Sequence, residues 1–104
     1  MEKLNFHLIT LGNARSQFVD VIRAGVAATT AITQYNHFIA TYEIVCEALR
    51  AEYENFPTAE QFESLENLTR AIHAMYEEVQ MHFDFYKLPP ENKHQLPAPV
   101  IYSK

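Results

Sequence analysis

The sequence predicts an all-α protein built around a long antiparallel helical hairpin of coiled-coil type. Apolar residues recur at every seventh position from residue 18 to residue 56, which is the spacing of a coiled-coil seam. A turn with helix-capping residues lies at Pro57, and a second stretch of helical apolar spacing follows it. Because a tight turn joins the two helices, they must run antiparallel.

Length and composition predict one soluble domain. The chain has 104 residues, of which 48% are apolar and 20% charged, as is typical of a folded globular protein with one modest core. The single cysteine, Cys46, cannot form an intrachain disulfide, which favours a reducing compartment. No apolar run reaches the ~20 residues that cross a bilayer, and the N-terminus lacks a signal-peptide core. We therefore expect a cytoplasmic protein that does not enter membranes.

The first segment fits two patterns. Leu4 and Leu8 belong both to an alternating pattern and to a helical one, and we favour a short helix over residues 1–12. Gly12 is a helix C-cap signal and Asn13 is an N-cap signal, so a break or bend of the chain is expected at these two residues.

Residues 14–55 are expected to form one uninterrupted helix of roughly 60 Å, at ~1.5 Å per residue. Gly25 is a poor helix former, and a kink at residues 34–37 is the alternative, but the unbroken register favours a continuous helix. The first seam column is Phe18, Gly25, Ile32, Ile39, Cys46 and Tyr53, and the second is Val21, Ala28, Tyr35, Tyr42, Leu49 and Phe56.

The second helix has the clearest start signal in the chain. Thr58 and Gln61 have the spacing of a capping box, so a helix is expected over residues 58–87, until two prolines end it. These helices complete a single domain over residues 1–88. Residues 89–104 contain four prolines and no helical pattern, which predicts an extended proline-rich tail.

The second helix is too short to cover the whole of the first. In a hairpin that turns at Pro57, Tyr86 lies opposite Ala28, so earlier residues are left uncovered. At about 1.5 to 3 kcal/mol per side chain, five exposed apolar residues would forfeit about 7 to 15 kcal/mol, comparable to the stability of a small domain. We therefore predict a homodimer that completes a four-helix bundle, with folding back of residues 1–12 as the alternative. The predicted interface residues are Phe18, Val19, Val21, Ile22 and Val26.

Negative charge is concentrated around the turn. The net charge is −5, yet residues 43–66 contain seven glutamates against Arg50 alone, whereas the remainder has six acidic and seven basic residues. Glu52 and Glu54 lie at the expected end of the first helix, where they oppose its dipole, so local stability does not explain them. We expect an acidic tip that faces a basic protein partner; a merely solvated tip is the alternative, and direct nucleic-acid binding is disfavoured. The tip residues are Glu43, Glu47, Glu52, Glu54, Glu60, Glu63 and Glu66.

The alternative function is a metal-binding helical bundle. His73 and Glu77 are four residues apart, as are Glu78 and His82, and such pairs can place two ligands on one helix face. The two pairs do not converge on one face, and no cofactor is expected.

Catalytic signals are weak. No serine lies in a glycine-flanked turn, no glycine-rich loop could hold a phosphate, and Cys46 has no evident base. The sequence therefore favours a non-enzymatic protein-protein interaction protein, such as an adaptor, an assembly component or a small inhibitor.

Overall fold

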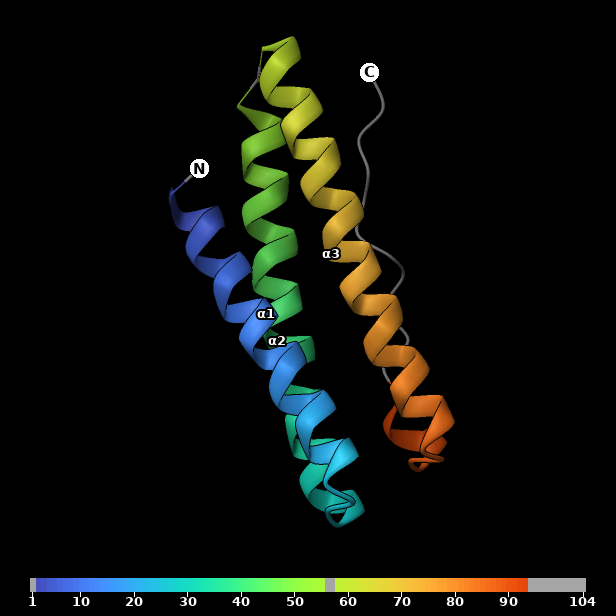
Figure 1. The fold of residues 1–104 in the computed structure, drawn as a ribbon. Coiled ribbons are helices and arrows are strands. Elements are labelled where there is room, and N and C mark those ends of the chain that lie inside the picture. Colours follow the sequence, from blue (N-terminus) through green and yellow to red (C-terminus); the bar gives the residue numbers. More distant parts are fainter. Residues whose placement is uncertain (1, 56–57, 94–104) are drawn as a thin grey trace.

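The structure is a computed structural model that describes residues 2–55 and 58–93. Over these residues the chain is all-helical, which confirms the all-α part of the predicted fold class. Three α-helices form an elongated bundle in which each runs antiparallel to the next (Figure 1). The elements are α1 (Glu2–Arg23), α2 (Ala28–Glu54), α3 (Ala59–Phe85) and the short 3-10 helix η1 (Pro90–Asn92).

The expectation of one helix over residues 14–55 is wrong, because the chain reverses direction between α1 and α2. Gly25 has a φ of 69°, the left-handed conformation that glycine adopts without steric strain. The amide of Gly25 donates to the carbonyl of Ile22 at 3.1 Å, and the amide of Val26 donates to that of Val21 at 3.4 Å. These two bonds form the Schellman motif that commonly ends helices. Seam residues on both sides of the turn, such as Phe18 of α1 and Tyr35 of α2, face the same core, so both helices show the seven-residue spacing.

The break expected at Gly12 and Asn13 is absent, and α1 continues through both residues. The segment expected as a separate short helix is therefore the first half of α1. Packing explains the difference, because Leu4, Leu11 and Phe18 are all fully buried at seven-residue spacing along α1. Burial of this continuous face outweighs two weak capping signals.

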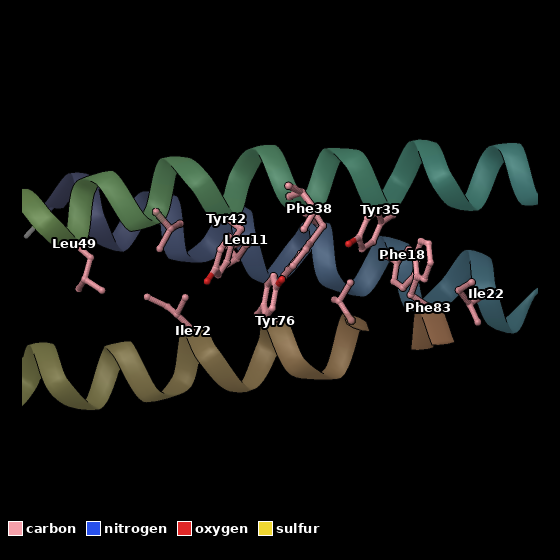
Figure 2. Close-up of a cluster of buried hydrophobic side chains, with 14 of the residues drawn as sticks. Leu11, Phe18, Ile22, Tyr35, Phe38, Tyr42, Leu49, Ile72, Tyr76 and Phe83 are labelled. Carbon is pink, nitrogen blue, oxygen red and sulfur yellow. The ribbon is translucent and has the colours of Figure 1, made fainter. Parts of the chain in front are cut away.

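Aromatic side chains tie the three helices together in the core (Figure 2). The ring of Tyr35 on α2 lies 4.7 Å from that of Phe83 on α3 and 5.9 Å from that of Phe18 on α1. Tyr42 and Tyr76 pair in the same way at 4.8 Å. Such tilted pairs stabilise a core beyond the burial of their area. Other large apolar side chains in the core are Leu4, Leu11, Phe38, Val45, Leu49, Leu65, Ile72 and Val79.

The five residues expected to stay uncovered are mostly covered within one chain. Phe18, Val19 and Ile22 are buried, and Val21 is half-buried against the core. Val26, in the turn, is 39% exposed. Since α1 folds back along the other two helices, the argument for a four-helix dimer from these residues does not hold.

The start of α3 agrees with the capping prediction, and its end lies two residues earlier than expected. The amide of Gln61 donates to Thr58 Oγ1 at 3.2 Å, and the amide of Thr58 donates to Gln61 Oε1 at 3.0 Å. Lys87, with a φ of 54°, ends α3, and Leu88 then turns back into the core. Of the expected extended tail, Pro90–Asn92 form η1, and residues 94–104 lie outside the described part of the chain, as does the seam residue Phe56.

Candidate functional site

The seven glutamates lie toward the end of the bundle where α2 and α3 continue past the start of α1 (Figure 1). Five of them are exposed, and Glu52 and Glu66 are half-buried. Arg50, the one basic residue in this stretch of sequence, donates to Glu47 at 3.3 Å. We call this surface the acidic end, and it consists of Glu43, Glu47, Glu52, Glu54, Glu60, Glu63 and Glu66.

The placement of two of these carboxylates opposes the local stability of α2. The last turn of α2 contains Glu52 and Glu54 and no basic residue. Its free carbonyl groups carry partial negative charge, so each glutamate there weakens the helix by about 0.3 to 1 kcal/mol. Glu60 has the opposite effect, because it lies in the first turn of α3. Glu52 and Glu54 thus oppose the dipole of α2 in the structure, as the sequence predicted.

Tyr53 links α2 to α3 near the acidic end. Thr69 donates its hydroxyl hydrogen to the carbonyl of Leu65 at 2.8 Å, so Tyr53 is the donor in the 3.1 Å bond between its hydroxyl and Thr69 Oγ1. The ring of Tyr53 also meets the ring of Phe62 edge to face at 5.4 Å. This buried bridge joins the last turn of α2 to the first three turns of α3.

An open groove of about 570 Å³ lies on the outer face of α2, next to α1. Ile44, in the middle of the groove, is 50% exposed. Phe6 of α1 is 66% exposed, and its ring lies 5.7 Å from the ring of His7, which lines the groove. The lining residues are His7, Ala40, Glu43, Ile44, Glu47 and Ala48.

Sequence reasoning did not find this groove. The only available signal was Ile44 itself, a large aliphatic residue in an outward column of α2 that is otherwise polar or small. Its neighbour His7 comes from a helix whose position beside α2 depends on the turn at Gly25, which the periodic pattern concealed. The groove therefore became visible only with the packing of α1.

The alternative metal ligands do not come together. His73 pairs with Glu77 on α3, whereas Glu78 accepts two hydrogen bonds of 3.1 Å from Arg15 of α1. The ring of His82 stacks 6.1 Å from that of Tyr86. Within residues 2–55 and 58–93, no three histidine, cysteine, aspartate or glutamate side chains are grouped so that they could hold a metal ion.

Polar groups in the core are held in their neutral forms. Burial raises the pKa of the Tyr42 hydroxyl, and the adjacent Cys46 thiol raises it further. Burial likewise raises the pKa of Cys46, so this thiol is protonated at neutral pH and is not an activated nucleophile. Gln80 donates to the Tyr35 hydroxyl at 2.8 Å, which places a polar link between α2 and α3 inside the bundle.

None of the described helices is both long enough and apolar enough to cross a membrane. Comparisons of the chain with protein-family models, with curated proteins and with solved structures found no match. Inference about function therefore rests on the surfaces of this chain alone.

Proposed function

We propose that this protein is a non-enzymatic interaction protein that binds a basic surface of a protein partner through its acidic end. One observation carries the proposal. Seven glutamates lie toward one end of the bundle, and two of them, Glu52 and Glu54, lie in the last turn of α2, where they oppose its dipole. Charges placed against the dipole of the helix that carries them indicate a role in binding.

The expected mode of binding is electrostatic. A cluster of like charges attracts a basic partner over a distance set by the salt concentration, about 8 Å at physiological ionic strength. Such a field accelerates association and orients the partner, while shape complementarity determines how long the complex lasts. A protein of this kind acts as an adaptor, an assembly component or a small inhibitor.

Self-association is a separate proposal. The homodimer expected from the sequence remains a prediction, but the residues that motivated it are mostly buried in one chain, and they no longer support it. Binding through the acidic end needs only one copy, because all seven glutamates lie on a single chain.

The proposal is tested with two charge-matched triple variants. One replaces Glu47, Glu52 and Glu54 by glutamine. The control replaces Asp20 by asparagine and Glu77 and Glu91 by glutamine, which are exposed acidic residues away from the acidic end. Each immobilised protein captures partners from a cell extract at low and at moderate salt, and association rates are then measured with the recovered partner.

We expect the first triple to slow association strongly and the control to leave it unchanged. The first triple should keep or slightly raise the melting temperature, because charges that oppose the dipole of α2 are removed. If both triples bind the recovered partner as well as the unaltered chain does, the acidic end is only a solvated surface.

A further inference from the structure

We propose that the groove on the outer face of α2 receives an amphipathic helix of the protein partner, with apolar side chains on the groove floor and lysine or arginine facing Glu43 and Glu47. This inference rests on the proposed function and deepens it, because it names where on the acidic surface the partner binds and what chemistry the partner presents.

The shape of the floor fits a helix. Ala40, Ile44 and Ala48 are four residues apart and form one column of α2, so a large side chain stands between two small ones. The two alanines are ~12 Å apart along the helix axis, at ~1.5 Å per residue. Residues seven or eight positions apart on a partner helix span nearly the same distance. Two of its apolar side chains can therefore pack over the alanines on either side of Ile44, as ridges pack into grooves.

The charge of the rim selects a basic helix. Glu43 and Glu47 are exposed and form a second column along one side of the floor. A lysine or arginine on the partner can cover the apolar floor with its aliphatic stem and place its charge beside these carboxylates. An acidic helix would bring like charges together, which opposes binding. Charge complementarity thus points to a basic partner.

The charge of the rim also disfavours a second copy of this chain as the occupant of the groove. In a two-fold dimer through this groove, each partner would present the same surface. Glu43 and Glu47 of one copy would then approach the same residues of the other. The repulsion would have to be offset by the small apolar area around Ile44.

Two large apolar side chains at and beside the groove are at least half exposed. Ile44 points away from a core that is already filled by the opposite face of α2. Phe6 lies on the outer face of α1 and extends the apolar surface beyond His7. Together they provide the apolar contact that charge alone does not supply.

The test uses synthetic helical peptides of about 18 residues, long enough to span ~27 Å. The first carries leucines on one face and lysines elsewhere. The second replaces every lysine by glutamate, and the third replaces every leucine by serine. Each fluorescently labelled peptide is titrated with the full chain, and binding is followed by fluorescence anisotropy. We expect the leucine-lysine peptide to bind, the glutamate peptide not to bind, and the serine peptide to bind at least tenfold more weakly.

Neutral variants locate the binding site. Ile44→Ser removes the central apolar contact, and Ala40→Gln places a longer side chain in the groove. The matched controls are Met81→Ser and Ala74→Gln, both exposed on α3. We expect each groove variant to lower the affinity for the leucine-lysine peptide about fivefold. Ile44→Ser does so by removing apolar contact area, and Ala40→Gln by filling part of the groove. Each control should leave the affinity unchanged.

The outcomes separate this inference from the proposed function. Suppose that the double variant Glu52→Gln and Glu54→Gln weakens binding of the leucine-lysine peptide and the groove variants do not. The acidic end then binds the peptide by charge alone, so the inference is wrong and the proposed function stands. If neither the carboxylate changes nor the groove variants alter binding of the leucine-lysine peptide, the peptide binds elsewhere and the inference is wrong, while the proposed function is judged by the recovered partner. A dimer in sedimentation velocity that Ile44→Ser dissociates would show that a second copy occupies the groove. Failure of the leucine-lysine peptide to bind at 100 µM would also overturn the inference, without affecting the proposed function.

Discussion

Replacing Gly25 by alanine distinguishes the turn in this structure from the continuous helix expected from the register. In the turn, Gly25 has a φ of 69°, and the position offers space for a Cβ atom because no heavy atom lies within 4 Å of it. The penalty is therefore conformational, and a non-glycine residue in the left-handed region costs about 1 to 2 kcal/mol. In a continuous helix the same change would stabilise the protein by about 1 kcal/mol, because alanine is the better helix former.

The two structures thus predict opposite signs. We expect Gly25→Ala to lower the free energy of unfolding measured by urea titration, with an unchanged m-value, and to lower the melting temperature by roughly 5 to 10 °C. Gly12→Ala is the control, because Gly12 lies inside α1 with open space around its Cβ position. It should raise stability by about 0.5 to 1 kcal/mol. A stabilising Gly25→Ala would refute the turn and restore a helix through residue 25.

Two further predictions concern the core. Tyr42→Asp and Ile39→Asp should abolish folding, judged by circular dichroism, because each variant buries an unpaired charge. Thr30→Asp should be tolerated, because Thr30 is exposed in the first turn of α2. Equal melting curves for all three variants would show that the core residues are assigned wrongly. The raised pKa of Tyr42 means that its phenol ionises at lower pH in the unfolded chain than in the fold, so its contribution to stability is complete below about pH 10 and is lost as the pH rises further. Tyr42→Phe should therefore reduce the alkaline loss of stability and leave stability at pH 7 unchanged or higher; an unaltered pH profile would contradict this.

Local signals in the sequence predicted what local geometry determines. The capping box at Thr58 and Gln61 needs only four residues, and both of its hydrogen bonds are present. Burial at seven-residue spacing also predicted that Tyr35 and Tyr42 face the core, because side-chain direction in a helix follows from spacing alone.

The turn at Gly25 escaped prediction because a periodic pattern records burial and carries no information on chain direction. Phe18 and Tyr35 occupy columns of one register in sequence, and in the structure their rings lie 5.9 Å apart on antiparallel helices. The dimer argument failed for the same reason, since it assumed that α1 extended away from the hairpin. Only a weak composition signal was available, namely a glycine followed by poor helix formers at Thr29 and Thr30.

The groove and the core lie on opposite faces of α2, so an effect on binding can be measured apart from an effect on stability. Tyr42, Val45 and Leu49 point into the bundle, whereas Ile44 and Glu47 point out of it. Substitutions at exposed positions usually change stability by less than about 0.5 kcal/mol. A loss of binding in Ile44→Ser at an unchanged melting temperature would therefore report on the surface alone. A matching loss of stability would instead show that the outer face of α2 supports the fold, and the groove would then lose its separate role.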